Sequence, residues 1–107
     1  MPVIRVDFDK KKVKTKDILA LSKAVQRIVS EVTHIEDVSV YANSPQIMVN
    51  AAPVEAFVQM SENKINDLDK LMGKITFGLS EWKKESKFPH KINLTFIPMK
   101  WKVEIGI

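Results

Sequence analysis

The sequence predicts an α+β fold of two layers, in which duplicated β-α-β units form one four-stranded mixed sheet with two helices on one face, followed by a short C-terminal strand. Apolar and polar residues alternate in four short segments, as is typical of half-buried strands. Two longer segments carry apolar residues every three or four positions, which is helical spacing. The strand-helix-strand order of residues 2–43 recurs over residues 53–98. We therefore expect a single domain with these two pseudo-repeat halves and a final strand at 100–106.

The first half begins with a strand over residues 2–8, in which Ile4, Val6 and Phe8 alternate with other residues. Thr15 then precedes a helix predicted over 16–32, and an acidic residue in its first turn complements the helix dipole. A second strand is predicted over residues 36–43.

The second half repeats this order. Ser61 or Asn63 is suited to cap the second helix, and Pro98 is expected to end the last strand of this half. The predicted elements are a strand over 54–60, a helix reaching about residue 84, and a strand over 91–97.

Right-handed crossovers place both helices on the same face of the sheet. The expected strand order is 36–43, 2–8, 54–60 and 91–97, with the two central strands antiparallel. The opposite face mixes apolar, aromatic and charged side chains, and Arg5 is expected to pair there with Glu55. The residues expected on this open face are Val3, Arg5, Ser39, Tyr41, Glu55, Phe57, Gln59, Asn93, Thr95 and Ile97.

Such a mixed face is poorly suited to bulk water, so we expect self-association to cover it. Trp101, Val103 and Ile105 alternate with polar residues, but Pro98 keeps them from simply continuing the preceding strand. We expect residues 100–106 to dock on an adjacent subunit and three subunits to close a ring. The alternative is a monomeric ferredoxin-like domain with an open sheet face.

Composition excludes several classes of function. The 107 residues contain no Cys and only two His, so we expect no disulfide, no metal site and no cofactor. No apolar run is long enough to cross a membrane, and Cys-free usage fits a cytoplasmic protein. The net charge of +4 comes almost entirely from lysine. Because Tyr41 and Phe57 are the aromatic residues expected on the open face, a single-strand RNA platform is disfavoured, and we expect no nucleic-acid partner.

The amino terminus carries a candidate catalytic group. Met1 precedes Pro2, a small residue after which the initiator Met is normally removed. An amino-terminal proline is a secondary amine, and an apolar pocket or nearby cations disfavour its charged form, which makes it suited to act as a general base. The alternative is that Met-Pro begins this chain by chance, as it begins many others.

The chain resembles the tautomerase superfamily, which includes 4-oxalocrotonate tautomerase and macrophage migration inhibitory factor. The features that carry this resemblance are the duplicated β-α-β order, Pro2 at the start of the first strand, and a sheet face that no helix is expected to cover. The chain is most similar to a family of small uncharacterised bacterial proteins in that superfamily, which also begin Met-Pro. Asn43 at the end of the second strand and Phe96-Ile97-Pro98 at the end of the fourth carry this likeness. The resemblance implies a homotrimer with three sites at subunit boundaries and Pro2 as the base.

The same resemblance implies roles for further residues. His34 or Thr33 stands where one branch of the superfamily has a cation before the second strand. Asn93 and Thr95 stand where the fourth strand reaches a neighbouring site in that branch. The arginines that bind dicarboxylates in another branch have no clear match.

Further binding residues follow from the expected fold. Tyr41 is a candidate pocket residue, and His34, Lys100 or Arg5 is expected to bind the anionic end of a ligand. The implied function is keto–enol tautomerisation of a small 2-keto or enol acid. The alternative is a non-catalytic oligomeric or protein-binding module of the same fold.

Overall fold

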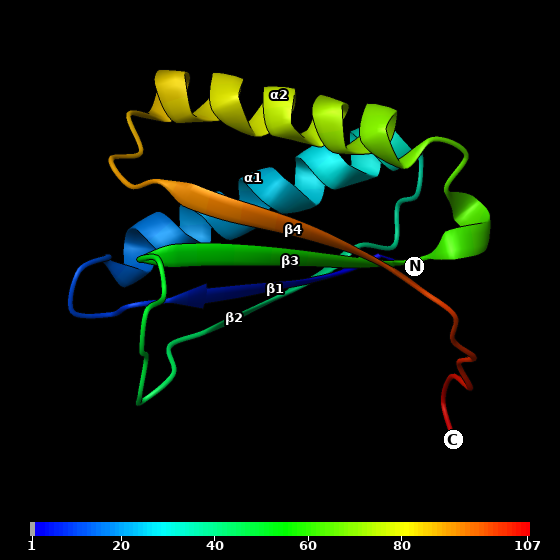
Figure 1. The fold of residues 1–107 in the computed structure, drawn as a ribbon, viewed down its shortest axis with the longest axis horizontal. Helices are drawn as coiled ribbons and strands as arrows, with labels where there is room; N and C mark the ends of the chain where they lie inside the picture. Colours follow the sequence, from blue (N-terminus) through cyan, green and yellow to red (C-terminus); the bar gives the residue numbers. More distant parts are fainter. Residues whose placement is uncertain (1) are drawn as a thin grey trace.

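A computed structural model describes residues 2–107 and confirms the two-layer α+β architecture (Figure 1). Two β-α-β units follow one another along the chain. The elements are β1 (Val3–Phe8), α1 (Thr15–Thr33), β2 (Ser39–Asn43), β3 (Val54–Ser61), a 3-10 turn η1 (Glu62–Lys64), α2 (Leu68–Ser86) and β4 (Ile92–Met99).

The sheet has the predicted strand order, β2-β1-β3-β4. The central strands β1 and β3 run antiparallel, with Val3 opposite Gln59, and each outer strand runs parallel to its central neighbour. Both helices lie over one face, and no helix or strand within residues 2–107 covers the other face (Figure 1). Neither helix within residues 2–107 has the length and apolar character needed to cross a membrane.

The core lies between the sheet and the helix layer. Ile4, Val6 and Val58 point from the central strands into it and are fully buried. The two helices approach closely at Gly78, because a Cβ built there would stand 2.8 Å from Cγ2 of Ile28. This glycine therefore sets the separation of α1 and α2.

The last strand continues further than the sequence predicts. Pro98 does not end it: β4 runs to Met99, and Pro98 lies opposite Met60 of β3. The strand tolerates proline because β4 is an edge strand, where the missing N–H can lie on the side without a partner. At the other sheet edge, β2 is shorter than expected and begins at Ser39 rather than at residue 36.

Both helices begin at residues other than the expected ones. Thr15 is the first residue of α1 rather than its cap. Neither Ser61 nor Asn63 caps α2; the Ser61 hydroxyl donates to Oδ1 of Asn63 at 2.6 Å. The cap is Asp67, whose Oδ1 accepts a hydrogen bond from the backbone N–H of Lys70 at 3.1 Å. A single 3-10 turn therefore occupies the start of the predicted helix.

Residues 100–107 form neither helix nor strand within this chain, so the strand expected at 100–106 is absent from the isolated subunit. They leave the sheet at the end of β4 and extend on the side away from the helices (Figure 1). A strand requires a neighbour for its backbone hydrogen bonds, and none is within reach here. Val103, Ile105 and Ile107 of this tail are exposed, Ile105 by 84%, and Trp101 is half-buried.

Candidate functional site

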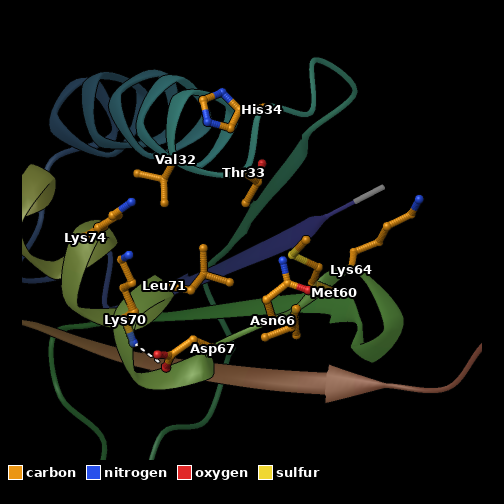
Figure 2. Close-up of a pocket in the computed structure, with 11 residues that line it drawn as sticks. Val32, Thr33, His34, Met60, Lys64, Asn66, Asp67, Lys70, Leu71 and Lys74 are labelled. Carbon is orange, nitrogen blue, oxygen red and sulfur yellow. Dashed lines mark hydrogen bonds between the residues drawn. The ribbon is translucent and has the colours of Figure 1, made fainter.

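A pocket of about 370 Å³ opens at the end of the sheet where β1 begins and β3 ends. It lies between the last turn of α1 and the segment that leads into α2 (Figure 2). Its lining is Val32, Thr33, His34, Met60, Lys64, Ile65, Asn66, Asp67, Lys70, Leu71 and Lys74.

The duplicated fold creates an equivalent space at the opposite end of the sheet, where β1 ends and α1 begins. There the space is filled: Val13 and Phe88 are buried in the core, and the Phe88 ring lies 5.4 Å from that of Trp82. At the pocket end, the corresponding loop carries polar side chains, including Lys64 and Asn66. Between the sheet and the helices, apolar residues therefore fill the space at one end, whereas the equivalent space at the other end is open and polar.

Pro2 lies at the pocket end of the sheet. It is fully buried, and its carbonyl oxygen accepts a hydrogen bond from the backbone N–H of Ser39 at 3.2 Å. Burial alternates from Pro2 along β1, so Pro2 faces the helix layer as Ile4 does. The antiparallel register places it at the same end as Met60, which lines the pocket.

The pocket lining is positively charged. It holds three lysines and one aspartate, which leaves two net positive charges with His34 neutral. Within residues 2–107, none of the ammonium groups of Lys64, Lys70 and Lys74 forms a salt bridge to a carboxylate. The single acid, Asp67, is engaged in capping α2. This arrangement favours a small anionic ligand.

His34 lines the pocket from the end of α1. Its backbone is left-handed, with φ of 59°, and it terminates the helix in the position where glycine is most common. Lys87 has the same role at the end of α2, with φ of 58°. His34 therefore borders the cavity directly. Its role in binding a ligand stays a prediction.

Most of the other predicted binding residues lie elsewhere in the isolated chain. Arg5, Tyr41 and Thr95 share one cross-strand row with Phe57 on the open face, and Asn93 lies one row further from the pocket end. The chain by itself does not bring these four side chains to the pocket.

Arg5 has partners other than the predicted Glu55. Its Nε donates to Oδ2 of Asp7 at 3.2 Å, and its guanidinium lies 4.5 Å from the centre of the Phe57 ring. The expected pairing is wrong because the register sets Arg5 opposite Phe57 and places Glu55 opposite Asp7.

Lys100 lies at the pocket end but outside the lining. Its Nζ is 3.7 Å from Oε1 of Glu62, a residue of η1, the same turn that provides Lys64 to the pocket. Both side chains of this pair are largely exposed to solvent, so it is a weak surface pair that an anion can disrupt.

The sequence analysis missed the lysines of the lining. Lys70 and Lys74 are four residues apart and therefore share one face of α2, a spacing that is visible in the sequence. Lys64 joins them through the turn before the helix, which no periodic pattern marks. Among the described residues 2–107, no group of three or more potential metal ligands comes together.

No protein-family model matches the sequence, and no curated protein matches it. Solved structures are similar in fold. A fused 4-OT wild-type symmetric trimer is 12% identical, with a TM-score of 0.70 over 98% of this chain and 94% of that one. A domain of unknown function from Sebaldella termitidis is 16% identical, with a TM-score of 0.68 over 100% and 98%. A macrophage migration inhibitory factor-like protein from Entamoeba histolytica is 13% identical, with a TM-score of 0.64 over 96% and 95%. This chain therefore has the fold of the tautomerase and macrophage migration inhibitory factor superfamily.

Proposed function

We propose that this protein is a tautomerase-like enzyme that moves a proton between carbon and oxygen of a small 2-keto or enol acid, with Pro2 as the general base. The observation that supports the proposal most is the position of the cationic pocket, which opens at the end of the sheet where the buried Pro2 begins β1. The likeness to solved superfamily members supports the fold in which such a proline acts.

The reaction needs a base and a group that stabilises negative charge. With Pro2 as the amino-terminal residue, its nitrogen takes a proton from the carbon next to the keto group. The C–H electron pair becomes the new C=C bond, and the carbonyl electrons move to oxygen, giving an enolate. Return of the proton to that oxygen gives the enol. Lys64, Lys70 and Lys74 supply the positive charge that favours the carboxylate and the enolate.

The surroundings of Pro2 suit a base. Its ring is buried on the side of the sheet that faces the helix layer. Lysines line the pocket at the same end of the sheet, although Pro2 is not itself one of the lining residues. Both burial and neighbouring positive charge disfavour the ammonium form of an amine and so increase the neutral fraction that accepts a proton.

The proposal includes a homotrimer. The open sheet face is flanked by two segments that project from the same side, residues 44–53 and the tail 100–107 (Figure 1). Ile47 and Ile105 are exposed on these segments. A symmetric assembly would cover the face and both segments. The similarity to a symmetric trimer supports this assembly.

In such a trimer, residues of the open face approach the site of a neighbouring subunit. Asn93 and Thr95 of β4 supply hydrogen-bonding groups there, and Tyr41 and Arg5 lie in the central rows of the same face. The proposal keeps Lys100, at the start of the tail, and His34, in the pocket lining, as residues that bind the carboxylate.

The test requires protein whose amino terminus is shown by mass spectrometry to be Pro2. We expect it to catalyse keto–enol exchange of a 2-keto acid. Matched controls are the Pro2→Gly variant and a form that retains Met1, in which the nitrogen of Pro2 is an amide. Equal rates for all three proteins would remove the proline-base proposal.

A second candidate function is a non-catalytic oligomeric or protein-binding module. The open face and the exposed apolar tail favour it, because both are suited to bind another chain. Mass spectrometry of the native protein separates the two candidates. A retained Met1 would block the base and favour the binding module.

A further inference from the structure

The two glycines of α2 differ in what surrounds them. At Gly78 an added Cβ would collide with Ile28, so helix packing accounts for this residue. At Gly73 an added Cβ would meet nothing within 4 Å. Glycine in the middle of a helix lowers stability relative to alanine. Packing therefore does not explain Gly73.

Gly73 is exposed, and it lines a hollow of about 520 Å³ between α1 and α2. The hollow is lined by Glu31, Val32, His34, Lys70, Gly73, Lys74 and Phe77. Val32, His34, Lys70 and Lys74 also line the candidate pocket, so the two spaces adjoin. Figure 2 shows Lys70 and Lys74 side by side at this junction, below Val32.

The hollow differs in chemistry from the pocket. Its far wall is Phe77, whose side chain is 67% exposed, an unusual position for an aromatic ring without a partner. Val32 forms the near wall. The acid of the lining, Glu31, has Oε1 3.6 Å from a guanidinium nitrogen of Arg27. Positive charge is therefore concentrated at the junction, and apolar surface lies beyond it.

We infer that the ligand of this site is an amphipathic organic anion, whose carboxylate binds in the pocket and whose apolar group lies in the hollow between Val32 and Phe77. Lys70 and Lys74 complement the carboxylate at the junction. The inference rests on the pocket as the ligand site of the proposed function but not on proton transfer by Pro2.

The experiment measures binding of straight-chain carboxylates, from acetate through butanoate and hexanoate to octanoate, to the full chain by NMR titration. Each methylene buried in the hollow is expected to lower Kd by about two- to fourfold, the upper value corresponding to about 0.8 kcal/mol. The amide signals of Gly73 and Phe77 should shift with the longer acids and not with acetate.

Variants locate the apolar group. Gly73→Leu places a branched side chain in the hollow and should bring the affinity for octanoate down toward that for acetate, while acetate binding stays unchanged. Phe77→Ala should weaken the dependence on chain length, and Phe77→Leu should restore it. Ala20→Leu, at an exposed position of α1, is the matched control and should behave as the unmodified protein.

Misfolding does not explain the expected loss, because Gly73→Ala and Gly73→Leu replace glycine with better helix formers and should raise the melting temperature. Equal affinities for acetate and octanoate would overturn the inference, and so would octanoate binding that Gly73→Leu leaves unchanged. If light scattering shows that Gly73→Leu changes the mass of the protein, the hollow is a contact between two copies of the chain, and this result would also overturn the inference. If the protein turns over a 2-keto acid but its affinity for carboxylates does not depend on their length, the proposed function stands and this inference fails. If affinity depends on the length of the carboxylate but there is no turnover, the proposed function fails and this inference stands.

Discussion

The guanidinium of Arg5 lies 4.5 Å from the centre of the Phe57 ring, directly across the central pair of strands β1 and β3. Arg5 also bonds to Asp7 at 3.2 Å, so the charge at the middle of the open face is already partnered within one chain. Because Arg5 is paired with Asp7 and lies over the Phe57 ring, another subunit can cover this part of the face without leaving the arginine as an isolated charge.

Phe57→Asp therefore tests whether the open face is the surface of self-association. The new carboxylate would stand opposite Arg5 and would replace an apolar ring of the open face with a charged group, so we expect the protein to have the mass of one 12.2 kDa chain. Phe77→Asp is the matched control, because this ring is exposed on the helix layer. Light scattering at micromolar concentration measures both. An unchanged mass for Phe57→Asp would contradict the proposed interface.

The ends of the two helices allow a paired test of His34. His34 and Lys87 each hold a left-handed backbone that costs a non-glycine residue about 1 kcal/mol. We expect His34→Gly and Lys87→Gly each to raise the free energy of unfolding by about that amount in urea titrations. Anion binding should weaken in His34→Gly but not in Lys87→Gly, because Lys87 lies at the end of the sheet opposite the pocket. Equal binding by both variants would show that the His34 side chain contributes nothing to the ligand.

Asp67 combines two effects that substitutions can separate. Asp67→Ala removes the cap of α2 and should cost about 1 kcal/mol of stability. Asp67→Asn keeps a capping oxygen but removes the negative charge from the lining, so stability should hold while carboxylates bind more tightly. Ser61→Ala, at a position that the sequence predicts as a cap, should change neither the stability nor the affinity for carboxylates. Calorimetric titration with a keto acid, together with thermal unfolding, distinguishes the three variants.

The contrast between the glycines of α2 predicts stability changes of opposite sign. Gly73→Ala should stabilise the fold by up to about 1 kcal/mol, because nothing opposes the added methyl group. Gly78→Ala should destabilise it by about 1 kcal/mol or more, since the new Cβ meets the stiff, β-branched Ile28 at 2.8 Å. Urea denaturation of the two variants measures the difference. If Gly78→Ala were more stable than the unmodified protein, the two helices would be able to move apart without a cost in free energy, contrary to this prediction.

Much of the fold could be predicted from the sequence because the buried faces are strictly periodic. Ile4 and Val6 in the first half, and Ala56 and Val58 in the second, alternate as strands facing helices must. The ends of elements were harder to predict. Pro98 is compatible with an edge strand, and Asp67 competes successfully with Ser61 and Asn63 as a cap, outcomes that depend on tertiary position.

The candidate site could be predicted only in part. His34 lines the pocket from the end of a helix, a position that the sequence pattern marks, whereas Pro2 lies at the same end of the sheet outside the lining and stays a prediction. The lysines of the lining were not identified, because their meeting depends on the path of the chain through η1 into α2. Each half of the chain begins with Pro-Val, at residues 2–3 and 53–54. Aligning the halves on this pair is wrong by one residue, because Val3 lies on the open face and Val54 faces the helices.

The central claim is that the nitrogen of Pro2 acts as the base, and hydrogen–deuterium exchange at C3 of a 2-keto acid in D₂O tests it most directly. We expect protein with a verified amino-terminal Pro2 to exchange these hydrogens faster than buffer, and the Met1-retaining form to be slower by a factor of about 100 or more, the range typical of a lost general base. Equal exchange rates for the two forms, with the same fold shown by NMR, would contradict the account.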